Sequence, residues 1–286
     1  MPELLDRISE NQIEPYIDGR FTEAPKTGVV ELDQHLRFKK NQVTIIGGAA
    51  NTGKTHGWLW VLFTWAKYLE SQPKFLLMTN ENDNVEMKVL LIEFYCEKYL
   101  NKCTREEIKT AWKWVEERFA FMPQNYKTNL EQVLYTAQDI KKTTGDFNGV
   151  FLDPYNSLQT ASYYEHYDNA SRMRGFVKKQ GVNLYVSMHV LSEAQRTRDK
   201  DGNIRVPHVA QLEHGSMWFN RADDAVVIHR QTQNADRKYV TELHVQKIKH
   251  TRSGGETTNH DTPIELKYDF NFGGFEWVTK KDKAGF

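Results

Sequence analysis

The segment Gly48-Ala49-Ala50-Asn51-Thr52-Gly53-Lys54-Thr55 fits the pattern G-x-x-x-x-G-K-[ST]. A short apolar run at residues 43–46 precedes it, and an apolar stretch with helical character begins at Lys54. In this strand–loop–helix context the glycines allow a tight turn, so that backbone N–H groups face a chain of phosphates. The N-terminus of the following helix adds the positive end of its dipole. The segment therefore predicts a phosphate-binding loop between a buried strand and a helix.

The last two residues of this loop predict how a nucleotide is held. The Lys54 ammonium reaches the β- and γ-phosphates, and the Thr55 hydroxyl ligates Mg²⁺. Such a site also needs an acid at the end of a later apolar strand, and Asp153 closes the run at residues 150–152. Taken alone, Asp153 is an ordinary strand-end aspartate, but together with the loop it predicts the second metal-side residue. We therefore expect ATP, or another nucleoside triphosphate, with Mg²⁺ bound by Thr55 and Asp153.

Glu81 is the candidate for activating water. In many ring NTPases a glutamate directly follows the metal-side aspartate, but Pro154 stands there. Glu81 follows the apolar run at residues 75–78, which in a RecA-like sheet we expect to lie beside the strand of the phosphate loop. Its carboxylate would then face the γ-phosphate and could orient or deprotonate the attacking water. Asp83 and Glu86 are rival candidates for activating water, and either could instead be a solvated acid at the start of a helix.

His189 closes a fourth apolar run, residues 184–188. At that strand end an imidazole could contact the γ-phosphate and report its loss. A histidine packed at a strand terminus fits the same pattern, so the sequence leaves both interpretations open.

Apolar runs alternate with helical patterns through most of the chain. Thr104 and Glu107 form a capping box that opens a helix through Arg118. Residues 163–179 indicate another helix. A further helix is marked by an apolar face at Leu130, Val133, Leu134, Ala137 and Ile140. Near-continuous apolar strands separated by helices favour an α/β fold, with a mostly parallel central sheet and helices on both faces.

After Asn220 the pattern changes to short strands joined by turns. The strands are expected at residues 225–229, 241–248, 264–268 and 275–278, with Gly254-Gly255 and Gly273-Gly274 in the turns. The sequence therefore predicts one α/β domain over residues 26–286 with a strand-rich C-terminal edge. Residues 1–25 are expected to form a helical segment and a linker.

The chain of 286 residues carries 38 Lys and Arg against 38 Asp and Glu, which gives a formal net charge of zero. This balance argues against a protein that coats nucleic acid with its whole surface, but it allows a local basic lining. No apolar run approaches the roughly 20 residues of a membrane span, and no signal-peptide pattern opens the chain. Cys96 and Cys103 indicate reduced thiols. We therefore expect a cytoplasmic protein without membrane association.

The phosphate loop, Glu81, Asp153 and His189, in this order, resemble the RecA-like motor domain of the DnaB-family replicative ring helicases. The family includes the helicase half of phage primase–helicases and mitochondrial Twinkle, and the resemblance spans residues 26–278. Residues 215–230 and the later Val245-Gln246-Lys247 are most similar to phage-encoded members. The resemblance implies an ATP-dependent DNA helicase that assembles into a ring, a hexamer, around single-stranded DNA. It also implies 5′→3′ movement and unwinding of duplex DNA.

The resemblance further implies roles at the nucleotide. Glu81 matches the catalytic glutamate, Asp153 the metal-side aspartate and His189 the γ-phosphate sensor. Arg230 and Tyr268 lie where the family has side chains that stack on the nucleotide base.

Other matching residues are implied to act on DNA or between subunits. Gly215, within Leu212-Glu213-His214-Gly215-Ser216, matches a short loop that touches DNA. Lys247 and Lys249 match a strand whose basic residues reach the ATP of a neighbouring subunit. The family usually has arginine at the position of Lys249, so the sequence departs from the pattern there. We expect Lys247 and Lys249 to act in trans, with Arg252 assisting at most.

The segment at residues 190–208 is the candidate DNA-binding segment. It directly follows His189 and carries four basic side chains, Arg196, Arg198, Lys200 and Arg205. In the implied ring we expect them to line the central channel and to follow the phosphates of single-stranded DNA. Acidic residues dilute the positive charge, so a mobile, solvated loop is the alternative. These acids are Glu193, Asp199 and Asp201.

Two other classes of function are compatible with parts of the sequence. A RecA-like recombinase or repair ATPase would bind DNA without unwinding it. A DNA- or protein-binding module with a vestigial nucleotide site is disfavoured by the intact Lys54, Thr55, Glu81 and Asp153. The expected partners are single-stranded DNA, further copies of the chain, and a separate primase or polymerase. Residues 1–25 are too few for a fused primase domain, and a phage-encoded protein would act in the host cytoplasm.

Overall fold

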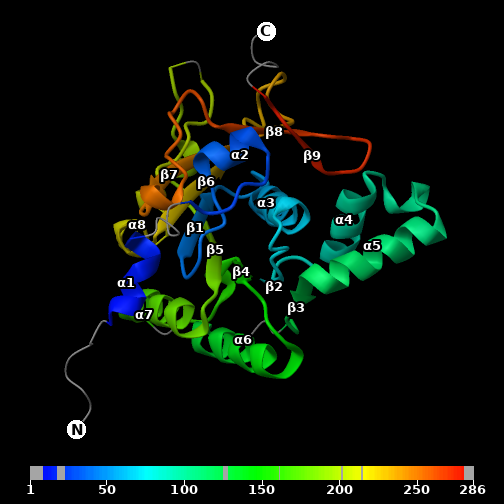
Figure 1. Cartoon of the computed structure of the whole chain (residues 1–286). Helices are drawn as coiled ribbons and strands as arrows, with labels where there is room; N and C mark the ends of the chain where they lie inside the picture. The colour runs from blue at the N-terminus through cyan, green and yellow to red at the C-terminus, as the bar shows by residue number, and fades with distance from the viewer. Residues whose placement is uncertain are drawn as a thin grey trace.

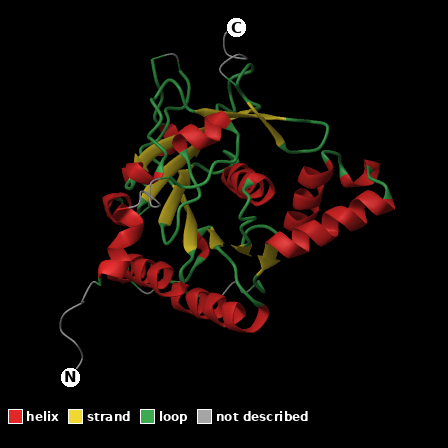
Figure 2. Ribbon diagram, in the orientation of Figure 1, coloured by secondary structure: helices red, strands yellow, loops and turns green. Residues whose placement is uncertain are grey.

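The computed structural model describes residues 9–17, 23–124, 128–160, 162–200, 202–213 and 215–279. A β-sheet with helices on both sides forms its centre (Figure 1, Figure 2). Within the described residues the sheet has nine strands in the order β3-β2-β4-β5-β1-β6-β7-β8-β9. Their bounds are β1 Val43–Gly48, β2 Phe75–Thr79, β3 Phe119–Phe121, β4 Gly149–Asp153, β5 Asn183–His189, β6 Asp224–His229, β7 Val240–Ile248, β8 Ile264–Tyr268 and β9 Phe275–Trp277.

The helices begin and end at recognisable signals. Thr104 caps α5 and Asn129 caps α6, each in a capping box that satisfies two backbone N–H groups. The helices predicted at residues 104–118, 130–140 and 163–179 are thus confirmed. The α-helices of the described residues are α1 Glu10–Ile17, α2 Val30–His35, α3 Lys54–Tyr68, α4 Asn84–Cys96, α5 Arg105–Arg118, α6 Leu130–Thr144, α7 Tyr163–Gln180 and α8 Ser216–Arg221.

The sheet is parallel from β3 to β6 and antiparallel from β6 to β9. This arrangement confirms the mostly parallel sheet and the strand-rich C-terminal edge. All residues of β1, β2 and β4 are buried, because helices cover both faces of the sheet. Helices α3, α4 and α5 contribute to the apolar cluster on one face, and α6, α7 and α8 to the cluster on the other.

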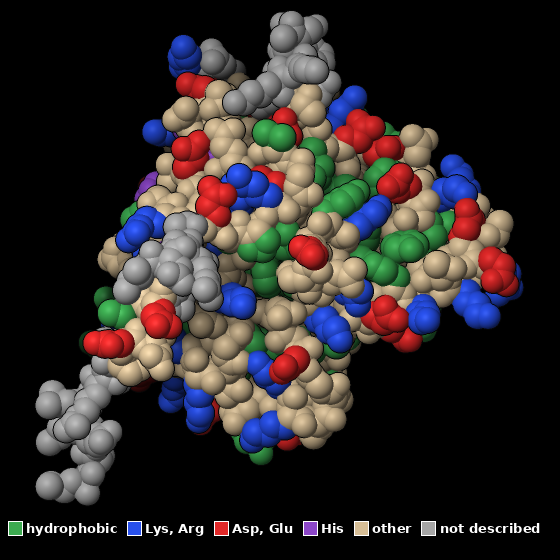
Figure 3. All heavy atoms as spheres, viewed as in Figure 1, with side chains coloured by type: hydrophobic (Ala, Val, Ile, Leu, Met, Phe, Trp, Pro, Cys, Tyr) green, Lys and Arg blue, Asp and Glu red, His purple; other side chains and the backbone are tan. Residues whose placement is uncertain are grey.

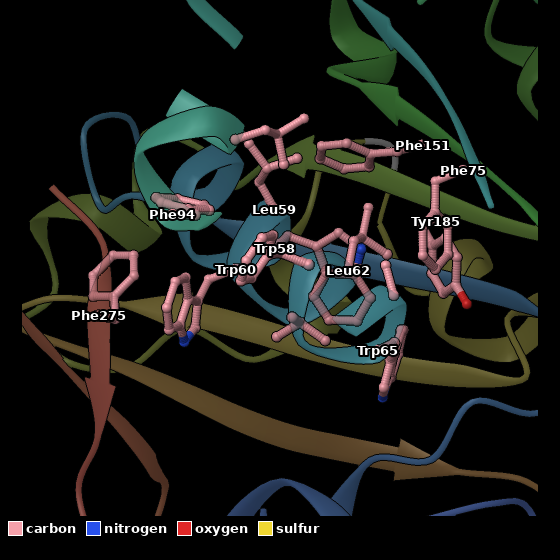
Figure 4. Close-up of a cluster of buried hydrophobic side chains, with 14 of the residues drawn as sticks. Trp58, Leu59, Trp60, Leu62, Trp65, Phe75, Phe94, Phe151, Tyr185 and Phe275 are labelled. Atoms are coloured by element: carbon pink, nitrogen blue, oxygen red, sulfur yellow. The ribbon is translucent and has the colours of Figure 1, made fainter. Parts of the chain in front are cut away.

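Other elements enclose helix α3, so that every residue from 57 to 66 is buried (Figure 4). Trp58 packs on Tyr185 of β5 with ring centroids 5.5 Å apart, and Trp60 packs edge-on against Phe94 of α4 at 4.9 Å. Phe275 of β9 lies 6.3 Å from Trp60 in the same cluster. Burial of these large rings holds α3, and therefore its first turn, firmly against the sheet.

The strand order corrects one expectation. β2 does not lie beside β1, because β4 and β5 separate the two strands. The parallel strands are all buried on both faces, so their apolar runs look alike and do not encode their order. The sequence does not predict β3 either, since three residues directly after α5 are too few to show a strand pattern.

At the N-terminus the structure describes α1 inside the expected helical segment, while residues 1–8 and 18–22 of that region lie outside the described residues. Residues 23–29 form neither helix nor strand. Among the helices that the structure describes, none has the length and apolarity needed to cross a bilayer. Basic and acidic side chains are interspersed on the face shown in Figure 3, as expected for a chain with zero net charge.

Candidate active site

The phosphate loop joins the end of β1 to the start of α3, as the sequence predicts. Gly48 has no room for a side chain, because an added Cβ would lie 2.5 Å from the Ile228 carbonyl oxygen. Gly53, the residue before α3, has a φ of +85°, a conformation that glycine adopts without strain. The loop therefore requires glycine at both positions. Its shape presents the first turn of α3, whose N–H groups have no partner within the helix, to a bound anion.

The Lys54 ammonium lies inside the loop. Nζ donates a hydrogen bond of 2.8 Å to the Ala49 carbonyl oxygen and lies 3.3 Å from His189 Nδ1. Burial lowers the pKa of Lys54, while the charges of Asp153 and Glu81 oppose this shift. A buried cation near two acids thus occupies the position from which the motif's lysine contacts phosphates.

Thr55 and Asp153, both expected to bind the metal ion, are in direct contact. The Thr55 hydroxyl donates a hydrogen bond of 2.5 Å to Asp153 Oδ2. Burial raises the pKa of Asp153 above its ordinary value, although the hydrogen bond from Thr55 and the charge of Lys54 oppose this shift.

This pair fits a magnesium ion. A hydroxyl and a carboxylate oxygen side by side are the hard donors that Mg²⁺ prefers. In the part of the chain that the structure describes, no three His, Cys, Asp or Glu side chains gather into a metal site. A cation with few protein ligands, which keeps waters and binds substrate phosphates, is how Mg²⁺ is held in nucleotide sites.

Glu81 reaches the site across the end of β4. The Asn80 N–H donates to the Asp153 carbonyl oxygen at 3.0 Å, which lays the segment after β2 over the end of β4. Glu81 Oε1 then lies 3.4 Å from His189 Nε2. Glu81 is therefore close to the phosphate loop even though β2 and β1 are not neighbours.

The two rival acids have other positions. Asp83 caps α4 by accepting a hydrogen bond of 2.7 Å from the Val85 N–H. Glu86 is exposed in the first turn of α4, and its charge favours that helix N-terminus. Among these three acids, a contact with His189 is made by Glu81.

Lys54 and Glu81 orient the ring of His189. Nδ1 faces the Lys54 ammonium, which only donates, and Nε2 faces the Glu81 carboxylate, which only accepts. These contacts assign the neutral tautomer with its hydrogen on Nε2. The His189 N–H donates to Asn156 Oδ1 at 2.8 Å, and its carbonyl oxygen accepts from the Glu213 N–H at 3.1 Å. Sequence reasoning assigns no role to Asn156, whose one signal is its place just after the metal-side aspartate.

Arg230 and Tyr268, expected at the nucleotide base, lie at the same edge of the sheet as the phosphate loop. Arg230 Nη2 donates a hydrogen bond of 2.6 Å to the Asn51 carbonyl oxygen within the loop. Tyr268 packs edge-on against Phe270 at 4.9 Å and His56 at 5.9 Å. Burial, together with Tyr99 and two acids nearby, raises the pKa of Tyr268 to about 12. Base stacking by Arg230 and Tyr268 stays a prediction.

His56 anchors the first turn of α3. Its Nε2 lies 2.6 Å from the Gly273 carbonyl oxygen, and its ring stacks on Phe94 at 5.5 Å. Burial, with a smaller effect of the Arg230 charge, lowers the pKa of His56 to about 4, although the hydrogen bond to Gly273 opposes the shift. The neutral ring therefore donates from Nε2 and ties α3 to the turn between β8 and β9.

The candidate DNA-binding segment is partly structured. Arg198 forms an antiparallel bridge with Ile204, and its guanidinium donates to the Gly202 carbonyl oxygen and to Gln233 at 2.9 and 3.0 Å. The side chains of Arg196, Lys200 and Arg205 are exposed. Asp201 and His214 lie outside the described residues. Gly215 directly precedes α8 with a φ of +77°.

A cavity of about 220 Å³ joins this segment to the phosphate loop. Its lining includes residues 49–52 of the loop, Arg205 and Pro207 of the segment, His229 at the end of β6 and Arg230 just after it. The two sites predicted from separate stretches of sequence are therefore adjacent.

Lys249 lies at the opposite edge of the sheet. Its Nζ lies 3.0 Å from Asp223 Oδ1, and the Asp223 N–H donates to the Val43 carbonyl oxygen at the start of β1. Arg174 of α7 pairs with the same carboxylate. The six residues of β1 span about 20 Å, so Lys249 cannot reach the phosphate loop of its own chain.

The ammonium of Lys247 is bound to the end of α8. Nζ lies 2.6, 2.8 and 3.4 Å from the carbonyl oxygens of Phe219, Ala222 and Asn220. An ammonium has three hydrogens, and all three are directed at these carbonyls. Lys247 therefore caps the C-terminus of α8. Arg252 lies exposed in the 3₁₀ turn Thr251–Ser253.

Two solved structures share this architecture over nearly the whole chain. The first, described as an ATPase domain, matches with a TM-score of 0.75 at 12% identity, over 96% of this chain and 100% of that chain. A DnaB-like replicative helicase, described with its interactions with primase, matches with a TM-score of 0.73 at 14% identity, over 96% of this chain and 69% of that chain. The fold is that of a DnaB-like ATPase domain. No family model and no curated protein matches the sequence.

The DnaB-like ATPase fold confirms the predicted fold class, a RecA-like sheet with a phosphate loop, and it confirms the resemblance at the level of architecture. At these identities the comparison supports the fold alone. The roles of individual residues therefore rest on the contacts described above.

Proposed function

We propose that the chain is the ATP-hydrolysing motor of a replicative DNA helicase, which moves along single-stranded DNA and unwinds duplex. One observation carries this proposal: five side chains from four separate parts of the chain converge at one edge of a RecA-like sheet. They are Lys54, Thr55, Glu81, Asp153 and His189. A site for passive nucleotide binding would need the phosphate loop but not a carboxylate held near the position of the γ-phosphate.

Each of these side chains has a task in hydrolysis. The Lys54 ammonium stabilises the negative charge that develops on the γ-phosphoryl oxygens. Glu81 orients the attacking water and accepts its proton. His189 contacts the γ-phosphoryl group from between Lys54 and Glu81, so loss of that group changes the contacts of its ring. Mg²⁺ held by Thr55 and Asp153 would neutralise charge on the phosphate oxygens.

Arg230 and Tyr268 are proposed to hold the nucleotide base. Both lie at the edge of the sheet that carries the phosphate loop, and Arg230 already contacts the loop through Asn51. A guanidinium and a phenol ring are suited to stacking on a base from two sides.

A ring of subunits is proposed, and the position of Lys249 supports it. Its ammonium lies at the edge of the sheet far from its own phosphate loop, and its side chain is 41% exposed. It can therefore act on the nucleotide of an adjacent copy, which closes a ring when each copy repeats the contact. Lys247 supports this strand by capping α8 and assists only indirectly. A hexamer, 5′→3′ movement and a separate primase or polymerase as partner are carried over from the resemblance. Residues 26–286 are proposed as the motor unit, and residues 1–25 as a linker and helical segment before it.

The DNA side of the motor is proposed at residues 190–208 and at Gly215. Arg196, Lys200 and Arg205 present exposed basic side chains, and the cavity beside the phosphate loop makes Arg205 a neighbour of the nucleotide site. Contacts of this kind follow phosphates and do not read sequence.

Release of phosphate from ATP tests the proposal. In the presence of Mg²⁺, we expect hydrolysis that rises when a single-stranded oligonucleotide is added. Lys54→Ala is the matched control and should remove both the basal and the stimulated rate, by about 10²–10³-fold if Lys54 acts as other preorganised donors do. A wild-type protein that releases no phosphate with or without DNA would contradict the proposal.

A further inference from the structure

Asn156 occupies a junction between three segments of the chain. It lies in the 3₁₀ turn Tyr155–Ser157, which follows β4. Its Oδ1 accepts a hydrogen bond of 2.8 Å from the His189 N–H, and its Nδ2 donates to Glu213 Oε2. One amide thus contacts both His189, the proposed γ-phosphate sensor, and Glu213, which lies two residues before Gly215.

Main-chain hydrogen bonds join the same two segments. The Glu213 N–H donates to the His189 carbonyl oxygen at 3.1 Å, and the Leu191 N–H donates to the Gln211 carbonyl oxygen at 2.9 Å. Val190 and Leu212 form an antiparallel bridge between these contacts. The backbone of His189 is therefore paired with the residues that lead into Gly215, and a displacement of one segment displaces the other.

Any such displacement would also move the ring of His189, which lies in the nucleotide site. Nδ1 lies 3.3 Å from Lys54 Nζ, and Nε2 lies 3.4 Å from Glu81 Oε1. A shift of the His189 backbone by a few tenths of an ångström would change both distances. A continuous set of contacts therefore runs from Glu213 through Asn156 and His189 to Lys54 and Glu81.

We propose that Asn156 is a positioning residue that couples DNA contact at Gly215 to the nucleotide site. This inference rests on the proposed function, because it requires that Gly215 touches single-stranded DNA. Asn156 itself contacts neither nucleotide nor DNA. It holds His189 in a position that depends on where Glu213 lies, so that DNA binding favours the arrangement of Lys54, His189 and Glu81 that hydrolyses ATP.

The chemistry of the amide suits this role. An acceptor must face the His189 N–H, and a donor must face the Glu213 carboxylate, and asparagine supplies both from one planar group. An aspartate would keep the acceptor but set two carboxylates against each other. The hydrogen bond between Asn156 and Glu213 is charge-assisted and therefore stronger than a bond between two neutral groups, so its loss weakens the contact between the two segments more.

The test exchanges donor and acceptor across this bond. Asn156→Asp removes the donor, Glu213→Gln keeps an acceptor oxygen, and the double variant restores a bond in which the glutamine amide donates to the aspartate. Asn148→Asp makes the same replacement at an exposed residue just before β4, at the opposite edge of the sheet, and serves as the control.

The readout is the coupling between nucleotide and DNA. The affinity for a single-stranded oligonucleotide is measured with and without a non-hydrolysable ATP analogue, and the ratio of the two affinities is the coupling factor. In the wild type we expect a factor within the range of about 5–150 that such couplings show. Asn156→Asp should bring the factor close to one while the protein still binds the analogue. The double variant should recover at least half of the wild-type factor on a logarithmic scale, and Asn148→Asp should match the wild type.

Two results would overturn the inference. One is an Asn156→Asp protein whose coupling factor equals that of the wild type. The other is a double variant that couples no better than Asn156→Asp, because coupling that depends on the bond between residues 156 and 213 should return when that bond is restored. A wild-type factor of one would contradict the proposed function as well, which separates that failure from a failure of the coupling alone.

Discussion

The Thr55 hydroxyl donates a 2.5 Å hydrogen bond to Asp153, joining the first turn of α3 to the end of β4. The two residues are 98 positions apart in the chain. Their contact brings together the two motifs that the sequence predicts for Mg²⁺ and phosphate binding. Glu81, Lys54 and His189 surround this pair, and the predictions below test their tasks and those of the more distant residues.

Glu81→Gln should bind ATP but hydrolyse it slowly. The amide keeps the shape of the side chain and loses the base, which corresponds to a loss of about 10²–10⁴-fold in turnover. Phosphate release and equilibrium binding of ATP are measured on the same preparation. Glu86→Gln is the control, since Glu86 is exposed on α4. Normal turnover by Glu81→Gln together with lost turnover by Glu86→Gln would move the catalytic role to α4.

If residues 190–208 bind DNA phosphates, they should contribute to the salt dependence of the affinity for single-stranded DNA. Replacing Arg196, Arg198 and Arg205 together by alanine should flatten the plot of log affinity against log salt by up to about 0.7 per lost contact. Basal hydrolysis without DNA should persist. The control replaces three exposed basic residues of α5, namely Arg105, Lys109 and Lys113. An unchanged slope in the first variant would leave residues 190–208 as a solvated loop.

The loop chemistry of the site can be predicted from sequence because it is local. Gly48 to Thr55 are consecutive residues that join β1 to α3, and Gly48 is explained by the 2.5 Å that would separate an added Cβ from the Ile228 carbonyl oxygen. Asp153 is predictable because the carboxyl ends of parallel strands meet at one edge of the sheet. In both cases residue type and a flanking apolar run carry the information.

Relationships between strands are not local and cannot be predicted this way. The expectation that β2 lies beside β1 is wrong, yet Glu81 still reaches His189, because the segment after β2 crosses the end of β4. The three carbonyl contacts of Lys247 and the two contacts of Asn156 depend on elements brought together by the whole fold. No periodicity or spacing in the sequence encodes them.

Lys249 should act across a subunit interface. Lys249→Ala should lose DNA-stimulated hydrolysis, because a cation that stabilises the γ-phosphoryl charge of a neighbouring copy is removed. Mixing Lys249→Ala with Lys54→Ala subunits should then restore part of the rate, since some sites in a mixed ring are intact on both sides. Arg252→Ala is measured beside it. Full activity of Lys249→Ala with lost activity of Arg252→Ala would make Arg252 the residue that acts in trans.

His56 should make the stability of the protein depend on pH. Its pKa is about 4 in the fold, against 6.5 for an unperturbed histidine. The unfolded chain therefore binds the proton more readily, and the free energy of unfolding should fall as the pH drops from about 6.5 towards 4. The contribution of this group is about 2 kcal/mol between pH 7 and pH 5.

His56→Gln checks this effect, because the glutamine amide can still donate to the Gly273 carbonyl oxygen but does not titrate. Denaturant unfolding at pH 7 and pH 5 should show a smaller pH dependence in His56→Gln than in the wild type. The exposed His250→Gln should behave as the wild type does. Equal pH dependence in all three proteins would contradict the assignment of His56 as a buried, neutral anchor.

Unwinding of a forked DNA duplex with ATP and Mg²⁺ tests the central claim most directly, with the wild type and Lys54→Ala compared side by side. A duplex with a single-stranded 5′ tail should be separated by the wild type and not by Lys54→Ala, because removal of the ammonium lowers hydrolysis by about 10²–10³-fold. A wild-type protein that hydrolyses ATP on single-stranded DNA but separates no fork of either polarity would contradict the helicase assignment.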